Sequence, residues 1–211
     1  MNRQIKEKQK KSTADKVLNF CLILSAVLLA ASIIYNLLAP LQFAIVSGES
    51  MMPTLQDGQW HLLDTRDSAI NNIKKGDIIT VTTQNKRIIK RVVGMPGDEL
   101  RLNYNDDGTT LCLEQKINGE WVKINEPYIN EPIIEENAQK IEGDENIAVQ
   151  VNEITSDGQK YISYWKCGEN EYVILGDNRN HSNDSRALGV IKKEEIYGTY
   201  YSHDFEDYTG K

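Results

Sequence analysis

The chain contains one long segment without a charge, residues 17–35, with the sequence VLNFCLILSAVLLAASIIY. As an α-helix rising about 1.5 Å per residue, it would nearly match a hydrocarbon core of about 30 Å. A cleaved secretory signal is the alternative, but its apolar core is usually about 7 to 15 residues and ends at small residues. Here the best cleavage position, after Ala39, has Leu37 three residues before it and Pro40 next. We therefore predict a retained transmembrane helix over residues 17–35.

The charges divide at this segment. The whole chain carries a net charge of −7, which argues against a nucleic-acid partner. Residues 1–16 hold six basic and two acidic side chains, a net charge of +4, so the body after the segment carries −11. By the positive-inside rule, residues 1–16 form a cytoplasmic basic head and the body lies outside the cell membrane.

The body is predicted to be mostly antiparallel β-structure. Apolar and β-branched runs alternate with turn signals at residues 42–46, 77–83, 87–93, 171–176 and 197–203. Residues 102–168 are more polar and carry a net charge of −8, whereas the parts that flank them carry −3. We expect an extracytoplasmic catalytic core over 36–101 and 169–211, interrupted by an acidic, β-rich insertion or cap subdomain over 102–168.

Cysteines constrain the body little. Cys112 and Cys167 would pair in an oxidising compartment only if the fold brought them together, and the chain has no Cys-rich framework. The sequence leaves this pairing open, as it does the oligomeric state.

A constrained serine follows the apolar segment closely. Ser50 lies between Gly48, which permits unusual backbone dihedrals, and Pro53, which fixes its own φ. A rigid loop presents a nucleophile well, although a simple turn with an exposed serine would look the same. A serine nucleophile also needs a base.

Lys90 is the candidate base. None of the histidines, His61, His181 and His203, has an Asp at a spacing typical of a triad. A lysine can replace histidine if burial lowers its pKa by two or three units, at a cost of roughly 3 to 4 kcal/mol. Lys90 lies in the β-branched run 87–93, where both faces look at least half buried, although a lysine in such a strand is more often an edge-strand protector.

A polar segment, residues 176–186, follows the apolar run 171–176. It could be an ordinary surface loop or a buried network that orients a neutral lysine. In the second interpretation Ser182 holds the amine, while Asp184 and Arg186 brace the loop.

Together the three segments resemble the conserved boxes of bacterial type I signal peptidases of the Gram-positive type, peptidase family S26. The matching motifs are SGESMMPTL (47–55), KGDI (75–78), KRVVGMPGD (90–98) and GDNRNHSNDSR (176–186), in the family's order and spacing. The resemblance spans residues 42 to about 200 and is weak over 102–168. It implies the signal peptidase or LexA-like fold.

The resemblance also implies an activity: a membrane-bound Ser/Lys endopeptidase that removes signal peptides with small residues at positions −3 and −1 from exported preproteins. Ser50 would be the nucleophile and Lys90 the general base, with no cofactor and no metal. The backbone N–H of Ser50 would hold the oxyanion. Some members have a serine where this chain has Gly48, so we hypothesise that a different second donor acts here.

Supporting roles follow from the same resemblance. Ser182, Asp177, Asp184 and Arg186 are expected to support the pair, and Met51 and Pro53 to contact substrate. His181 receives no catalytic role. Only about 15 residues separate the apolar segment from Ser50, so the site is expected close to membrane lipid.

Three other interpretations remain. Ser163 and Lys166 match the S-x-x-K motif of penicillin-binding proteins and β-lactamases, without the companion motifs. A self-cleaving regulatory protease uses the same Ser/Lys chemistry but would be cytosolic. A catalytically inactive binding protein for exported chains would have no need of both Ser50 and Lys90.

Overall fold

The structure is a computed structural model that describes residues 2–38, 40–83, 86–134 and 163–201. The chain forms two compact units, residues 1–41 and 42–211. Most of the second half of the expected insertion, residues 135–162, lies outside the described residues, as does the end of the last expected strand.

The first unit is a single helix, α1 (Asn2–Leu38). Within it, Asp15–Tyr35 has a mean hydropathy of 2.6 and is long and apolar enough to cross a membrane. The sequence contains no Pro or Gly between residues 2 and 38, so nothing there interrupts the helical hydrogen bonds.

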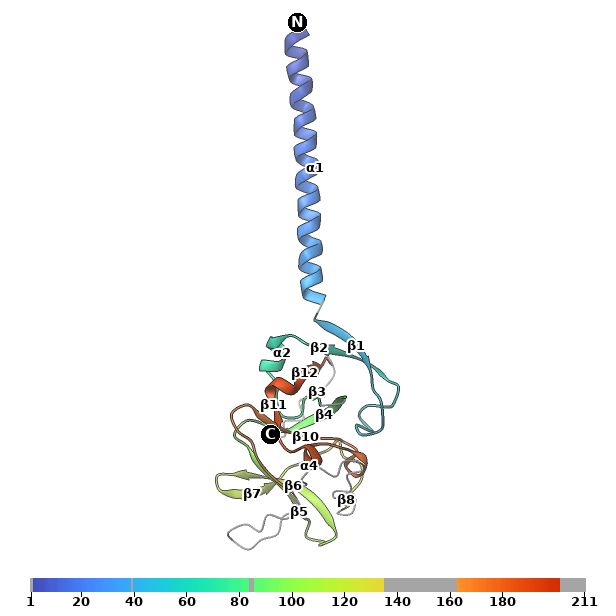
Figure 1. The fold of residues 1–211 in the computed structure, drawn as a ribbon, viewed down its shortest axis with the longest axis vertical. Helices are drawn as coiled ribbons and strands as arrows, with labels where there is room; N and C mark the ends of the chain where they lie inside the picture. The colour runs from blue at the N-terminus through green and yellow to red at the C-terminus, as the bar shows by residue number, and fades with distance from the viewer. Residues whose placement is uncertain (1, 39, 84–85, 135–162, 202–211) are drawn as a thin grey trace. The chain divides into compact units, whose positions relative to one another are not determined.

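The second unit is built mostly from antiparallel β-strands, which confirms the predicted fold class (Figure 1). Among the described residues, one sheet has seven strands in the order β1-β2-β12-β3-β4-β10-β11, and the other has five, with β7-β6-β5-β9 in this order and β8 paired to β6. The strands are β1 (Leu41–Ile45), β2 (Trp60–Asp64), β3 (Ile78–Thr82), β4 (Arg87–Gly94), β5 (Glu99–Tyr104), β6 (Thr110–Ile117), β7 (Glu120–Lys123), β8 (Ile133–Ile134), β9 (Ser163–Lys166), β10 (Glu171–Leu175), β11 (Ile191–Lys192) and β12 (Ile196–Tyr200).

In the described part of this unit the helices are single turns or little more. They are α2 (Asp67–Asn71), α4 (Ser185–Leu188) and the 3₁₀ helices η1 (Arg179–His181) and η2 (Lys193–Glu195). The five runs predicted as strands correspond to β1, β3, β4, β10 and β12. β2 was missed because its sequence, WHLLD, lacks a clear alternation of polar and apolar residues.

The chain leaves the seven-stranded sheet after β4 and returns to it at β10. These two strands pair directly, with Ile174 opposite Val92 and Leu175 opposite Arg91. All the strands of the second sheet lie between them in the sequence. The excursion therefore keeps β4 and the segment that follows β10 side by side.

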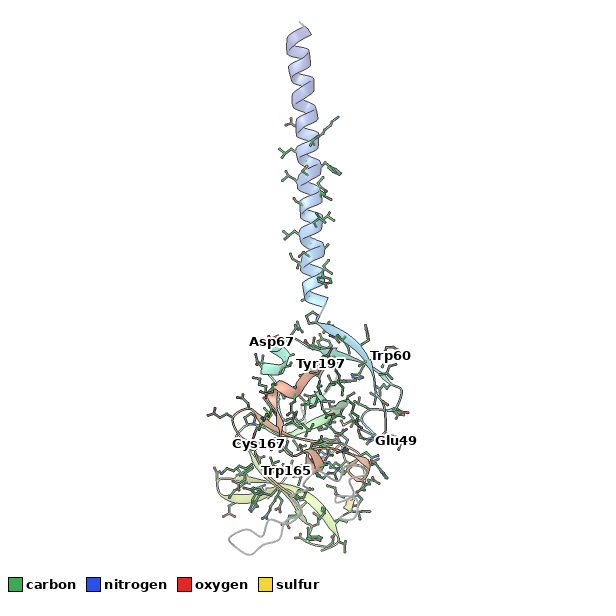
Figure 2. The ribbon with its side chains drawn as sticks, viewed as in Figure 1. Glu49, Trp60, Asp67, Trp165, Cys167 and Tyr197 are labelled. Atoms are coloured by element: carbon green, nitrogen blue, oxygen red, sulfur yellow. The ribbon has the colours of Figure 1, made fainter. Side chains whose placement is uncertain are left out.

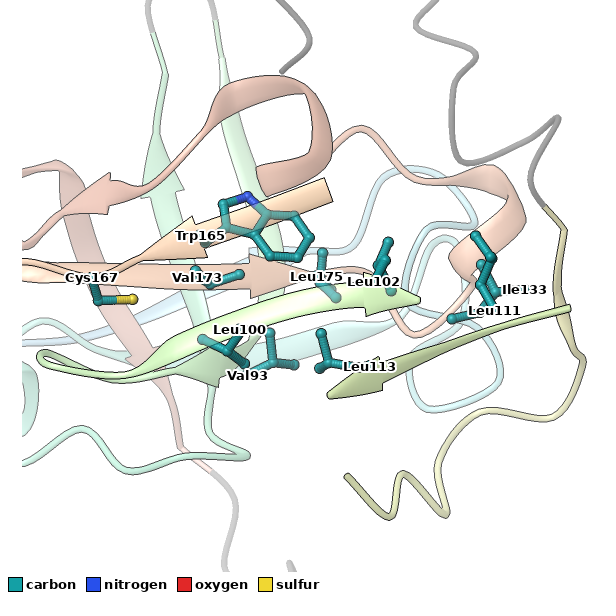
Figure 3. Packing of buried hydrophobic residues seen from close by; sticks show 10 residues of the cluster. All are labelled: Val93, Leu100, Leu102, Leu111, Leu113, Ile133, Trp165, Cys167, Val173 and Leu175. Atoms are coloured by element: carbon teal, nitrogen blue, oxygen red, sulfur yellow. The ribbon is translucent and has the colours of Figure 1, made fainter. Parts of the chain in front are cut away.

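A core cluster joins the two sheets (Figure 3). It combines Val93, Val173 and Leu175 from β4 and β10 with Leu100, Leu102, Leu111, Leu113, Ile133, Trp165 and Cys167. The indole N–H of Trp165 donates to the carbonyl of Ser185 at 3.0 Å, so its one polar atom is satisfied. Cys112 and Cys167 are both buried and free, and no disulfide joins them.

The core predicts a difference between two positions on β6. Leu113 is fully buried, whereas Ile117 is 45% exposed. Leu113→Ala should lower the free energy of unfolding by about 2–5 kcal/mol through lost burial and a cavity. Ile117→Ala should change it by less than about 1 kcal/mol. Urea unfolding of the full chain in detergent measures both, and equal effects would contradict this packing.

Candidate active site

Ser50 and Lys90 meet in the second unit. Lys90 Nζ lies 2.7 Å from Ser50 Oγ and also donates to the carbonyl of Ile89 at 2.7 Å. Ser50 lies on the loop after β1, and Lys90 lies in the middle of β4, opposite Ile79 of β3. A pair separated by 40 residues is thus in hydrogen-bond contact.

Lys90 is 3% exposed. Burial is the largest influence on its amine and lowers the pKa of Lys90 to about 8, although the carboxylates of Asp184 and Asp177 oppose the shift. A substantial fraction of this amine is therefore neutral near pH 8, whereas an exposed lysine would be almost fully protonated. A neutral amine within hydrogen-bond reach can accept the proton of the Ser50 hydroxyl.

The loop that carries Ser50 is held by its own backbone and by a neighbouring loop. The N–H of Asn178 donates to the carbonyl of Ser50 at 3.1 Å, and Asn178 Nδ2 donates to the carbonyl of Glu49 at 3.2 Å. Sequence reasoning did not single out Asn178. Its position three residues after the end of β10 was the available signal.

Gly48 has φ +94° and lines the cleft. Its N–H donates to Asp57 Oδ1 at 2.8 Å, so this N–H is already engaged. Within the described residues, the N–H of Ser50 makes no hydrogen bond. Of the two, the N–H of Ser50 is therefore the one available to an incoming oxyanion.

Asp177 forms a buried ion pair with Arg91. Both side chains are about 1% exposed, and Arg91 donates to the two carboxylate oxygens at 2.8 and 2.6 Å. Thr54 also donates to Asp177, and Arg91 donates to the carbonyl of Gly76 at 2.7 Å. Arg91 and Thr54 were not among the site residues predicted from the sequence, although the alternation of β4 placed Arg91 on a half-buried face.

Asp184 and Arg186 form a second buried pair. Arg186 donates to both carboxylate oxygens at 2.8 Å, and Asp184 also accepts from the N–H of Gly176 at 2.9 Å. Burial alone would raise the pKa of Asp184, but Arg186 and these hydrogen bonds hold it below its usual value. The carboxylate therefore stays ionised and caps α4 through the N–H of Arg186.

The same loop has little room for side chains beside Ser50. A Cβ built on Gly176 would lie 2.2 Å from Ser182 Oγ and 2.5 Å from the carbonyl oxygen of Ser50. Gly176 is therefore required for this close approach. Ser182 Oγ itself is buried and has no hydrogen-bond partner among the described residues. Its expected bond to Lys90 is not seen, so that role stays a prediction.

A cleft of about 520 Å³ opens beside Ser50 and Lys90. It is lined by β1, β2, β3 and β4 and by the loop of Ser50, including Met51. Met51 is also 1% exposed and packs in a core cluster with Val46 and Leu55. Pro53 is exposed and is not part of the lining, so the structure gives no cleft contact for its expected substrate role.

The remaining sequence-predicted side chains lie apart from the pair. His181 is exposed at the rim of the cleft. Ser163 is buried on β9 while Lys166 is exposed, because residues three apart on a strand point to opposite faces. S-x-x-K chemistry, which needs the two side chains together, does not fit. In the described part of the chain no group of three or more His, Cys, Asp or Glu side chains is placed to hold a metal.

The second sheet is tied to the loop after β10. Arg179, 1% exposed, forms a bidentate ion pair with Glu126, which lies between β7 and β8. Asn180 also exchanges hydrogen bonds with the carbonyl of Pro132 and the N–H of Ile134. The segment that sequence analysis treated as an insertion therefore supports the loop that contacts Ser50.

Comparisons with known proteins point to one family. The family described as "Signal peptidase, peptidase S26" matches residues 17–202. Signal peptidase I of Bacillus amyloliquefaciens is 33% identical over 198 residues, covering 92% of this chain and 90% of that protein. Signal peptidase IB of Staphylococcus aureus is 33% identical over 154 residues, 72% of each chain. A solved signal peptidase I from Enterococcus faecalis is 28% identical and covers 61% of this chain and 96% of that chain, with a TM-score of 0.37.

Burial of Lys90 predicts a cost in stability. The folded chain binds this proton with a pKa of about 8, against about 10.5 when unfolded, so the free energy of unfolding rises with pH between these values. Below pH 8 the penalty is about 3 kcal/mol. Lys90→Met should therefore unfold at higher urea than the unmodified chain at pH 7, and the difference should shrink towards pH 10.

Lys166→Met is the matched control, because Lys166 is an exposed strand lysine. Its difference from the unmodified chain should not depend on pH over this range. A Lys90→Met difference that is the same at pH 7 and pH 10 would contradict the shifted pKa.

Proposed function

This chain belongs to the signal peptidase family, peptidase S26, and we propose that it is a membrane-anchored serine endopeptidase that removes signal peptides from exported preproteins. The observation that carries the proposal is the 2.7 Å contact between Ser50 Oγ and a lysine that is 3% exposed. Few environments in a protein provide an uncharged amine beside a serine hydroxyl.

In the proposed first step Ser50 Oγ attacks the carbonyl carbon of the residue at position −1. Lys90 Nζ accepts the hydroxyl proton as the new C–O bond forms. The tetrahedral intermediate collapses when the C–N bond breaks, and Lys90 gives its proton to the leaving amine. The products of this step are an ester between Ser50 and the signal peptide, and the free N-terminus of the mature protein.

In the second step Lys90 removes a proton from a water molecule, which attacks the ester carbonyl. The C–O bond to Ser50 breaks, and Ser50 Oγ regains a proton from Lys90. The N–H of Ser50 supports both steps by donating to the oxyanion. A second group, other than the N–H of Gly48, also donates to the oxyanion in this proposal, because the N–H of Gly48 is hydrogen-bonded to Asp57.

The supporting residues hold β4 and the loops of the site in position. Arg91 and Asp177 fix the register of β4 against the loop of Ser50 through Thr54. Asp184 and Arg186 fix the loop after β10. We assign Ser182 a role in orienting the amine of Lys90, and Met51 a role in forming the floor of the cleft.

We further propose that the helix α1 anchors the chain in the cell membrane. The segment Asp15–Tyr35 has the required length and hydropathy. The charge of +4 in residues 1–16 favours a cytoplasmic N-terminus and an extracytoplasmic second unit. This orientation places the cleft on the side where the cleavage sites of exported preproteins emerge.

Removal of either member of the pair should abolish activity. Ser50→Ala and Lys90→Ala should each lower cleavage of a preprotein with Ala at −3 and −1 by at least about a thousandfold. Ser68→Ala and Lys166→Ala, at exposed positions, are the matched controls and should cleave normally. Cleavage is followed by gel electrophoresis with the full chain in detergent. Normal cleavage by a folded Ser50→Ala or Lys90→Ala variant would rule out this mechanism.

The pH profile should identify the base. Because the neutral form of Lys90 is required, kcat/KM should rise with pH and level off above an apparent pKa of about 8. The measurement uses a peptide substrate without ionisable side chains near the cleavage site. An acid limb centred near 6.5, the ordinary value for histidine, would indicate another base.

A further inference from the structure

Two buried polar side chains line the cleft without any part in the proposed mechanism. His61 on β2 is 4% exposed, and Thr80 on β3 is 3% exposed. Both line the same cleft as Ser50 and Lys90. The neighbouring residue on β2, Trp60, is 66% exposed and lies at the surface (Figure 2). Because successive side chains of a strand point to opposite faces, His61 points inward.

The polar atoms of these two side chains are unsatisfied. Within the described parts of the chain, neither ring nitrogen of His61 nor Oγ1 of Thr80 has a hydrogen-bond partner. The ring of His61 stacks on Tyr200, with centroids 5.7 Å apart and planes at 20°, which orients the ring but uses neither nitrogen. A buried polar group without a hydrogen-bond partner is unfavourable, so a ligand group that pairs with it gains affinity.

The surroundings are apolar. Leu63 follows His61 on the same face of β2, Ile89 is opposite Thr80 in the sheet, and all four line the cleft. A cleft that only excluded large side chains would need no polar lining, and valine would suit the strand at position 80 equally well. Burial lowers the pKa of His61, so the neutral ring carries one donor and one acceptor. The hydroxyl of Thr80 can also donate and accept.

We propose that His61 and Thr80 form a polar subsite that receives a hydroxyl-bearing small side chain, serine or threonine, at position −3 of the preprotein. The inference rests on the proposed function, because it takes the cleft as the substrate site. Neither His61 nor Thr80 is hydrogen-bonded to Ser50 or Lys90. Those two side chains are bonded to each other, and Lys90 also to the carbonyl of Ile89. The side chain beside the attacked carbonyl belongs to position −1, and the next one on the same face of an extended substrate belongs to position −3.

The test compares substrates of equal volume. Two preproteins differ only at position −3, where one has Thr and the other Val. The ratio of their kcat/KM values is measured for the unmodified chain and for His61→Phe, Thr80→Val and the double variant, all as full chains in detergent. Phenylalanine keeps the stacking on Tyr200, and valine keeps the shape of threonine, so each variant removes hydrogen bonding with little change in packing.

The unmodified chain should favour Thr over Val at −3, and the ratio should fall about tenfold in the double variant, the equivalent of one neutral hydrogen bond. A second pair of substrates, with Ser or Ala at −1, is the control for position and should give the same ratio in all four proteins. An unchanged Thr/Val ratio at −3, with cleavage retained, would overturn the subsite. If the kcat/KM ratio changed only for the pair that differs at −1, the assignment of the subsite to position −3 would be overturned.

A binding measurement distinguishes failure of this inference from failure of the proposed function. Peptides with Thr or Val at −3 are titrated into the Ser50→Ala form, with and without the Thr80→Val substitution. Tighter binding of the Thr peptide that is lost with Thr80→Val supports the subsite whether or not the unmodified chain cleaves. Equal binding of both peptides overturns it. Failure of the unmodified chain to cleave any preprotein, with this binding preference intact, would contradict the proposed function alone.

Discussion

The buried ion pair between Arg91 and Asp177 connects the segments that carry the site. Arg91 belongs to β4, Asp177 to the loop after β10, and Thr54, which donates to the same carboxylate, to the loop of Ser50. The ring of Tyr128 lies 4.1 Å below the guanidinium. Burying two charges is expensive, and the cost is recovered only when hydrogen bonds satisfy both groups. Here those bonds come from several segments, so the pair is stable only when all of them are in place.

The topology makes this convergence possible. β4 and β10 are neighbours in the seven-stranded sheet although 76 residues lie between Gly94 and Glu171 and the second sheet is formed between them. Antiparallel pairing of Leu175 with Arg91 leads the chain directly to Gly176, beside the carbonyl of Ser50. The second sheet contributes Glu126, whose ion pair with Arg179 anchors the same loop. Because the second sheet is inserted between β4 and β10, it supports this loop without lengthening the chain between Ser50 and Lys90.

Much of this arrangement follows from local sequence patterns, and some of it does not. The strands β3, β4 and β10 are short apolar runs between turn residues, and Ser50 and Lys90 stood out by their settings. The partners of Arg91, Arg179 and Asn178 depend on contacts across more than 50 residues, which periodicity does not encode. The expected contact of Ser182 with Lys90 came from the polar composition of residues 176–186, and that of Pro53 with substrate from motif position. Burial of His61 and Thr80 required the register of β2, β12 and β3.

The low pKa of Lys90 requires an explanation, because two ionised carboxylates lie near it. Asp184 and Asp177 both favour the charged amine. Each of them, however, is already paired with a guanidinium, Asp184 with Arg186 and Asp177 with Arg91. Arg186 itself disfavours the charged amine, as does Lys86 at the cleft. Arg186 offsets part of the field of Asp184, and desolvation, the largest influence, decides the protonation of Lys90. Arg186 therefore does more than brace its loop: it weakens the effect of the carboxylate that would restore the charge the proposed base must lose.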